Sequence, residues 1–338
     1  MGFRDAGFKI AGAVEIDQDA ATAFHLNVGV MPIVKDIRDV RGGDLLTSAG
    51  LQRGQLTLLF GCPPCQSFTV LRRGAELTPH DRKRNALVHD YLRLVEELHP
   101  RHLAFENVPG LVTGRWRPLF DRFLNRLTAL GYTVEWKTVD AAIYGVPQRR
   151  RRVLVIGSRV TTPQLPKVKH CQHGCLEHAP FVTVRDTIAH LRPLDSGEQD
   201  PDDELHRARR HGNLTLKRLA HIPEGGARMD LPDPLILDCH RNHDGHYDIY
   251  GRMWWDRVAP TLTSGCTNVT RGRFAHPEQH RAITLREAML LQSFPSYARL
   301  YGGAERMALQ VGNAVPALVT EHVGKAIKTM ERRSRRKW

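Results

Sequence analysis

The chain has 338 residues, of which 41% are hydrophobic and 25% are charged. This composition excludes an intrinsically disordered protein, and the length favours two domains over one compact core. No apolar run approaches the roughly 18 residues of a membrane span. The N-terminus lacks the apolar core of a signal peptide, so we expect a cytoplasmic protein whose 6 cysteines form no structural disulfides.

The net charge of +13 points to a polyanionic partner. The 49 basic residues divide into 39 arginines and 10 lysines. A general preference for arginine explains this ratio, but not the excess over 36 acidic residues. Guanidinium groups bind phosphate oxygens and guanine edges in bidentate geometry. The excess therefore favours nucleic acid, ahead of a membrane surface.

Strand and helix patterns alternate over the first 160 residues. Strand patterns cover residues 10–14, 56–60, 102–105, 133–139 and 153–156, and helical patterns cover residues 20–27, 85–98 and 118–130. The second helical pattern carries one apolar stripe, made of Leu87, Tyr91, Leu94, Val95 and Leu98. This alternation predicts an α/β fold with a doubly wound, mostly parallel sheet. In such a sheet the functional residues lie in loops after the strand carboxyl ends.

The composition and the periodicity of the sequence change at about residue 158. From there to residue 255 the chain is rich in His, Pro, Asp, Arg and Gly and has no long helical period. Helical patterns return over residues 285–292 and 315–330, followed by a basic tail. We predict a larger domain of residues 1–190 and 280–338, and a smaller, loop-rich domain of residues 191–279.

A cysteine loop, GCPPCQ at residues 61–66, follows the second strand pattern. Its two prolines fix the backbone and present Cys65 at the carboxyl end of that strand. The C-x-x-C spacing fits three interpretations: a redox pair, half of a zinc site, or a single nucleophile, Cys65, with Cys62 incidental. The spacing alone does not decide between them.

Three further segments bear on which of these interpretations of the cysteine loop applies. FENVPG at residues 105–110 puts a carboxylate at the end of another strand, YGVPQRRRR at 144–152 leads into a strand, and QVGNAVP at 310–316 lies far downstream. In this order, together with the cysteine loop, they resemble the bacterial type of DNA (cytosine-5)-methyltransferase family across nearly the whole chain. The resemblance implies a Rossmann-like methyltransferase domain with a smaller target-recognition domain. It also implies methyl transfer from S-adenosylmethionine to C5 of a flipped-out cytosine in duplex DNA.

The resemblance implies roles for individual residues. Cys65 matches the nucleophile that adds to C6 of cytosine, and Glu106 matches the carboxyl group that holds N3 and the exocyclic amine. Arg152 matches an arginine that helps to place the base, and Arg150 one that supports the site. Taken singly, Glu106 also fits a helix cap or an ion pair, and the arginines also fit a solvated face. The implied contacts to S-adenosylmethionine are Glu15, Ile16, Asp36, Ile37, Pro64, Leu87, Asn313 and Val315.

The sequence departs from the family at its start. The family opens with a strand that ends in Phe-x-Gly-x-Gly, whereas this sequence begins MGFRDAGF, which matches only the end of the following helix. The missing strand is central to the sheet and lies between the strands predicted at residues 10–14 and 56–60. We expect an initiator upstream of Met1 rather than a decayed gene, and poor binding of S-adenosylmethionine by the 338-residue chain.

In the family, the smaller domain reads the target sequence. We therefore expect sequence choice within residues 194–252 of a monomeric modification or restriction-modification enzyme, whose partners are duplex DNA and, in that setting, a cognate restriction endonuclease. Two His/Cys clusters, within residues 170–178 and 239–246, lack finger-like spacing, so we predict no metal site. A tRNA cytosine-5 methyltransferase and a DNA-binding pseudoenzyme stay open as alternatives. Candidate DNA contacts in the smaller domain are Arg207, Arg209, Arg210, Arg241 and Arg252.

Overall fold

The structure is a computed structural model that describes residues 1–64, 78, 86–241 and 245–335. It divides into two compact units. The first unit comprises residues 1–140, 151–167 and 319–338, and the second comprises residues 141–150 and 168–318. These units are defined by packing, and the predicted assignment of residues 191–279 to a separate recognition domain stays a prediction. Among the described residues, no helix has both the length and the apolar composition that crossing a membrane requires.

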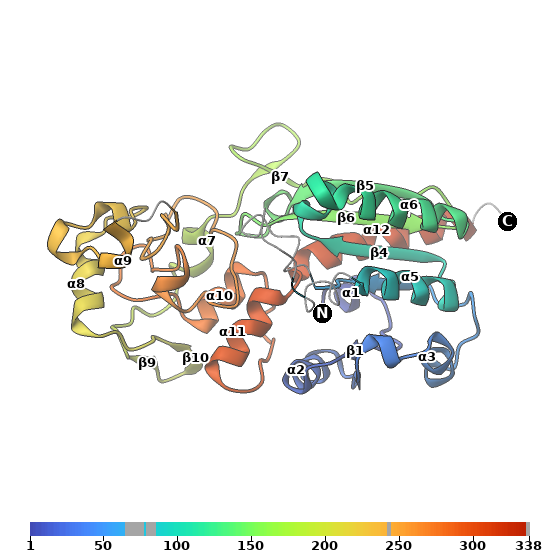
Figure 1. Ribbon diagram of the computed structural model, residues 1–338, viewed down its shortest axis with the longest axis horizontal. Helices are drawn as coiled ribbons and strands as arrows, with labels where there is room; N and C mark the ends of the chain where they lie inside the picture. The colour runs from blue at the N-terminus through green and yellow to red at the C-terminus, as the bar shows by residue number, and fades with distance from the viewer. Residues whose placement is uncertain (65–77, 79–85, 242–244, 336–338) are drawn as a thin grey trace. The chain divides into compact units, whose positions relative to one another are not determined.

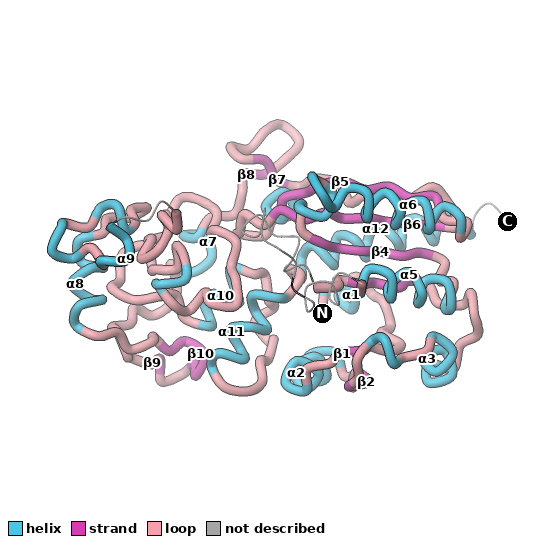
Figure 2. Tube along the Cα trace, viewed as in Figure 1, coloured by secondary structure: helices cyan, strands magenta, loops and turns pink. Residues whose placement is uncertain are grey.

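The first unit has the predicted α/β composition (Figures 1 and 2). Its strands are β1 (Val14–Glu15), β2 (Ile33–Val34), β3 (Leu58–Gly61), β4 (His102–Asn107), β5 (Thr133–Asp140) and β6 (Arg151–Ser158). Its helices are α1 (Gly2–Asp5), α2 (Gln18–Val28), α3 (Gly42–Ala49), α5 (Leu87–Leu98), α6 (Arg117–Ala129) and α12 (Ala317–Arg335), and short 3-10 turns lie at Ile37–Asp39, Pro109–Val112 and Gly114–Trp116.

A four-stranded sheet in the order β3-β4-β6-β5 forms the centre of this unit. The pair β3–β4 is parallel, whereas β6 runs antiparallel to both of its neighbours. One face carries α5 and α6, whose apolar residues form a single core with Leu103 and Phe105 of β4. On the other face, Glu331 of α12 contacts His102 of β4. All six residues of β4 are buried, as expected for a strand that is covered on both sides.

The packing of α5 on β3 depends on a glycine. A Cβ atom at Gly61 would lie 2.3 Å from the ring of Tyr91, so a larger residue would push the helix away from the strand. The Tyr91 hydroxyl group donates a hydrogen bond to the Ala104 carbonyl at 3.0 Å, which fixes the ring. The helix ends where His99 adopts a left-handed conformation, with φ of 49°. The predicted apolar stripe is confirmed, because its residues from Tyr91 onward are all buried.

The strand predicted at residues 10–14 is wrong in extent, because only Val14 among them belongs to a strand. That strand, β1, pairs only with β2, and the two form a sheet of their own. No strand of the described chain pairs with the second edge of β1, or with the edge of β3 opposite to β4. The Ala13 carbonyl accepts one ladder hydrogen bond, from Ile33 N at 2.9 Å, but residues 10–12 pair with no strand of the described chain. Among the described residues, β1-β2 and β3-β4-β6-β5 are thus two separate sheets.

The second unit is poor in regular structure, as predicted for the stretch after residue 158. Its strands are β7 (His170–Cys171), β8 (Ala179–Pro180), β9 (Gln199–Asp200) and β10 (Asp203–Arg207). Its helices are α7 (Val184–Ile188), α8 (Asn213–His221), α9 (Asp238–Arg241), α10 (Leu285–Leu291) and α11 (Ala304–Asn313). Short 3-10 turns lie at Ala141–Tyr144, Arg228–Asp230, Asp233–Leu235 and Val269–Arg271.

Buried arginines take over part of the hydrogen bonding that helices and strands would otherwise provide here. The Arg252 side chain donates to four main-chain carbonyl groups, those of Leu219, Ile222, His276 and Gln279. Burial lowers the pKa of Arg252 to about 10. Arg281 forms a bidentate ion pair with Glu287, with both N–O distances at 2.8 Å. Arg252 is thus a core residue, and its selection as a candidate DNA contact is wrong.

We predict that Glu331→Gln lowers the free energy of unfolding by about 1–3 kcal/mol, because it weakens the attachment of α12 to the sheet. Arg101 Nε donates to Glu331 Oε1 at 2.6 Å, and His102 Nε2 lies 2.9 Å from the same oxygen. Burial would raise the pKa of this carboxyl group, but the hydrogen bond and charge of Arg101 outweigh it, and the pKa is lowered. Burial likewise lowers the pKa of His102.

Both groups bind protons more readily in the unfolded chain, so acid removes their stabilising effect. The carboxylate contribution is complete above pH 4.5, the ordinary value, and falls as the pH drops through the folded pKa. Urea denaturation at several pH values should show the largest difference between wild type and Glu331→Gln above that pH. Glu321→Gln, on the same helix and paired with exposed Lys325, should cost less than about 0.5 kcal/mol. Equal losses for the two variants would contradict the prediction.

Candidate active site

The loops after β3 and β4 lie side by side. The two strands are parallel, and their register pairs Gly61 with Phe105. The next residue of each strand, Cys62 after β3 and Glu106 within β4, therefore falls at the same edge of the sheet. Asn107 Nδ2 then donates to the Pro63 carbonyl group at 3.2 Å, which joins the two loops.

Glu106 is the buried acid of this edge, with 4% of its surface exposed. The Cys62 thiol donates a hydrogen bond to Glu106 Oε2 at 2.8 Å. Arg152 Nε, from β6, lies 2.8 Å from Oε1 and forms an ion pair with it. This contact lacks hydrogen-bond geometry, and Oε1 accepts no hydrogen bond from any group that the structure describes. The two oxygens of Glu106 thus differ: Oε2 accepts a hydrogen bond from Cys62, and Oε1 is in contact only with the charge of Arg152 among the described residues.

The cysteine loop is described only in part. Pro64, a predicted contact to S-adenosylmethionine, is exposed and is the last residue of this loop that the structure describes. Cys65, the predicted nucleophile, lies outside the described residues. The structure therefore brings together two of the four predicted catalytic residues, Glu106 and Arg152, beside the loop that leads to Cys65.

Arg150 is separated from Arg152 by one residue of the sequence, yet it belongs to the second unit. It is 4% exposed, and its guanidinium group donates to the carbonyl groups of Leu262, Gly312 and Ala314 at 3.0–3.2 Å. This side chain ties the segment around residue 262 to the end of α11. The arrangement fits the supporting role that the resemblance implies for it.

Gln148 and Gln292 complete the same network. Gln148 is fully buried, its side-chain oxygen accepts from the Leu262 amide at 3.1 Å, and its amide nitrogen contacts the Gln292 side chain. Gln292 Nε2 in turn donates to the carbonyl groups of Val311 and Ala314 at 3.1 and 2.8 Å. Asn313 and Val315 therefore lie on a segment whose carbonyl groups accept hydrogen bonds from both Arg150 and Gln292. Asn313 is exposed and Val315 is half-buried.

The predicted nucleoside contacts follow the short parallel strands β1 and β2. Glu15 ends β1, and its Oε1 accepts hydrogen bonds from the amides of Ile16 and Asp17 at 2.8 and 3.0 Å. Ile16 beside it is 65% exposed. Lys35 N donates to the Glu15 carbonyl at 3.1 Å, so the segment after β2 runs alongside.

Asp36 follows β2 and forms an ion pair with Arg38. The hydrogen bonds from Arg38 lower the pKa of the Asp36 carboxyl group to about 2. The carbonyl of Ile37 accepts from Arg93 Nη2 of α5 at 2.8 Å, which fastens this turn to the helix that begins at Leu87. Glu15, Ile16, Asp36 and Ile37 thus gather at one edge, and Leu87 is half-buried at the start of α5.

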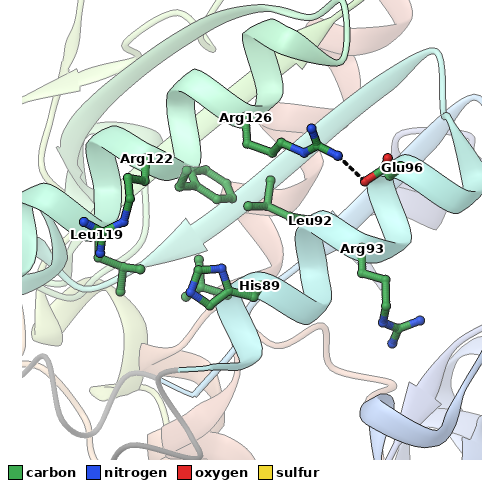
Figure 3. A pocket seen from close by; sticks show the side chains of 9 residues that line it. His89, Leu92, Arg93, Glu96, Leu119, Arg122 and Arg126 are labelled. Carbon is green, nitrogen blue, oxygen red and sulfur yellow. Dashed lines mark hydrogen bonds and ion pairs between the residues drawn. The ribbon is translucent and has the colours of Figure 1, made fainter.

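Two other features of the described residues concern metal ions and cavities. Among the side chains that the structure describes, no group of three or more His, Cys, Asp or Glu residues is placed to hold a metal ion. A groove of about 360 Å³ lies between α5 and α6 and is crossed by the ion pair of Arg126 with Glu96, at 2.6 Å (Figure 3). None of the predicted site residues lines it, and its lining residues are Val88, His89, Leu92, Arg93, Glu96, Leu119, Arg122, Phe123 and Arg126.

Sequence reasoning missed two contacts of predicted residues: that of Cys62 with Glu106 in the first unit, and that of Gln292 with Gln148 in the second. Gln292 has no local signal, because its partner Gln148 lies 144 positions away. For Cys62 a signal was present: a residue directly after one parallel strand lies beside the end of the next strand, where Glu106 had been identified.

Comparisons with known proteins give one family for nearly the whole chain. The family model for C-5 cytosine-specific DNA methylase matches residues 1–329. The chain is 34% identical over 328 residues to Type II methylase M.HgiDII of Herpetosiphon aurantiacus, covering 95% of this chain and 89% of the relative. It is 30% identical over 355 residues to Type II methyltransferase M.XorII of Xanthomonas oryzae pv. oryzae, covering 96% and 80%.

Among solved structures, the chain resembles an E. coli protein described as a DNA modification methyltransferase encoded within a prophage. The TM-score is 0.72 at 21% sequence identity, with 98% of this chain and 95% of that chain covered. The Entamoeba histolytica methyltransferase EhMeth has a TM-score of 0.61 at 16% identity, covering 97% and 94%. These likenesses confirm the predicted Rossmann-like α/β fold.

We predict that Gly312→Ala lowers the free energy of unfolding by about 1–3 kcal/mol. A Cβ atom at Gly312 would lie 2.3 Å from the backbone carbon of Thr263 and 2.4 Å from the nitrogen of Ser264, and neither can move as a side chain could. The same displacement would pull the Gly312 carbonyl away from Arg150. Urea denaturation followed by tryptophan fluorescence measures the loss. Gly43→Ala is the control, because its Cβ enters open space inside α3 and should be neutral or stabilising by up to about 1 kcal/mol. Wild-type stability of Gly312→Ala would contradict the prediction.

Proposed function

Because the chain belongs to the C-5 cytosine-specific DNA methylase family, we propose that it methylates cytosine in duplex DNA through a covalent Cys65 intermediate, using S-adenosylmethionine. The observation that carries the proposal is the setting of Glu106. Its carboxylate is buried at the end of β4, beside the cysteine loop, and its Oε1 accepts no hydrogen bond from a described residue. A buried acceptor of this kind costs free energy unless a bound molecule donates to it.

Cytosine C5 is a weak nucleophile, and addition of a cysteine thiolate to the ring makes it more nucleophilic. The Cys65 thiolate adds to C6, and the electron pair of the C5–C6 double bond becomes available at C5. When bound, S-adenosylmethionine would supply the methyl group: the electron pair at C5 bonds to the methyl carbon, the bond from that carbon to sulfur breaks, and S-adenosylhomocysteine leaves. The C5 proton then passes to a base such as water, the double bond re-forms, and the C6–S bond breaks to release the Cys65 thiolate. The base has to leave the helical stack for these contacts to form.

Glu106 and Arg152 hold the base during this addition. The carboxyl group of Glu106 binds the N3 edge and the exocyclic amine, which offsets charge that builds up on the ring when the thiolate adds. Arg152 lies against the same carboxyl group and helps to place the base. Arg150 supports the site by holding main-chain segments of the second unit, since its donors are directed at carbonyl groups.

The residues at the ends of β1 and β2 fit the nucleoside half of S-adenosylmethionine. Glu15 is fixed by two amide hydrogen bonds to one oxygen, so its other oxygen can accept from ribose hydroxyl groups. Exposed Ile16 offers an apolar surface for a purine ring. Ile37, Pro64 and Leu87 would add apolar contacts, Asp36 would lie near the adenine amine, and Asn313 and Val315 would contact the methionine half.

The names of the two relatives as Type II methylases support a place in a restriction-modification system. In that setting a cognate endonuclease cuts the same sequence, and a cytoplasmic monomer suffices for modification of duplex DNA. Recognition falls to the second unit, where Arg207, Arg209 and Arg210 are exposed around β10 and can reach phosphates or guanine edges.

We predict that DNA with 5-fluorocytosine at the target traps this protein covalently through Cys65, because fluorine blocks the final elimination. Cys65→Ser should abolish the adduct on denaturing gels, whereas Cys175→Ala, an exposed thiol of the second unit, should leave it unchanged. Labelled methyl transfer to duplex DNA, with tRNA in a parallel assay, tests the substrate. An adduct that persists in Cys65→Ser would refute the nucleophile, and transfer to tRNA alone would replace DNA as the substrate.

We predict that exchanging residues 194–283 with a Type II relative transfers the methylated sequence. Sequence choice was expected within residues 194–252, but Leu219, Ile222, Leu231 and Tyr250 share one core with Val269, Ala275 and Ala282. An exchange that ends at residue 252 cuts this core and should give an unstable chimera. Bisulfite sequencing reads the methylated site of both chimeras. A stable longer chimera that still methylates the acceptor's own site would place recognition elsewhere.

A further inference from the structure

Cys62 is held against the carboxylate of Glu106 by its local backbone. It follows β3 directly, and the parallel register with β4 puts it beside Glu106. The ring of Pro63 fixes the φ torsion of that residue. Asn107 Nδ2 donates a hydrogen bond to the Pro63 carbonyl group at 3.2 Å. The resulting contact, from the thiol sulfur to Glu106 Oε2, is 2.8 Å long.

The orientation of Glu106 needs such a contact. The terminal torsion of a carboxylate has a broad energy profile, so burial alone does not decide which oxygen points where. The structure gives the two oxygens different surroundings: Oε2 accepts from the thiol, whereas Oε1 faces Arg152 without a hydrogen bond. A thiol is a weak donor, so the 2.8 Å contact that the backbone holds in place is what distinguishes Oε2 from Oε1.

We propose that Cys62 is a positioning residue for methyl transfer: its thiol donates to Glu106 Oε2 and turns Oε1 toward the exocyclic amine of the cytosine, which donates a hydrogen bond to it. This assignment rests on the proposed function. It gives Cys62 a role distinct from that of Cys65, and no bond to Cys62 forms or breaks during the reaction.

Three variants test the assignment in the full chain. Cys62→Ala removes the donor, so kcat for methyl transfer to duplex DNA should fall about tenfold or more. The KM values should stay within about twofold and Tm within about 2 °C, because the lost contact orients one carboxylate and binds neither substrate. Cys62→Ser restores a donor and should keep kcat within about threefold of wild type. Cys175→Ala controls for the loss of an exposed thiol and should match wild type.

A double-mutant cycle separates positioning from a structural role. If Cys62 acts through Glu106, Cys62→Ala should change the residual single-turnover rate by less than about twofold in a Glu106→Gln background. The same factor of loss in both backgrounds would overturn the proposal, as would an unchanged kcat in Cys62→Ala. If Cys62→Ala fails to fold, a more than tenfold loss in folded Cys62→Ser would overturn it. Wild-type protein that methylates no DNA would instead refute the proposed function, and this inference with it.

Discussion

The parallel pairing of β3 with β4 is the constraint on which the candidate site depends. Four pairs of residues in register bring both carboxyl ends to the same edge, so that a loop thiol and a buried acid meet without any long side chain reaching across. Gly61 makes the pairing compatible with the helix above it, because the Tyr91 ring occupies the space of a Cβ. A polar contact between Cys62 and Glu106 thus follows from backbone geometry and from one apolar packing requirement.

Arginine serves two purposes in this chain, and composition does not separate them. The charge excess predicted a nucleic-acid partner, yet Arg150 and Arg252 are buried and donate to main-chain carbonyl groups. Arg281 is likewise buried against Glu287. A loop-rich unit leaves many carbonyl groups without helix or strand partners, and a guanidinium group with five donors satisfies several at once. Only exposed arginines such as Arg209 remain candidates for DNA contact.

Much of the first unit could be predicted from the sequence because its signals are local. The strands β3, β4, β5 and β6 and the helices α2, α5, α6 and α12 all lie where the sequence pattern predicted them, and so does α10 of the second unit. Glu106 was noted at the end of a predicted strand, and its role was implied by the resemblance to the family. The strand at residues 10–14 failed because a strand also needs a neighbour, and pattern alone does not supply one. Cys62 and Gln292 depend on partners far away in the sequence, which no local pattern records.

The attachment of α12 has a consequence for synthesis of the protein on the ribosome. Arg101, directly before β4, and His102 on β4 find their partner, Glu331, about 230 positions later. Until the last helix emerges, one face of the four-stranded sheet stays uncovered while the whole second unit is being made. A nascent chain of this kind exposes apolar strand surface for most of its elongation, which is the condition under which chaperones bind and aggregation begins.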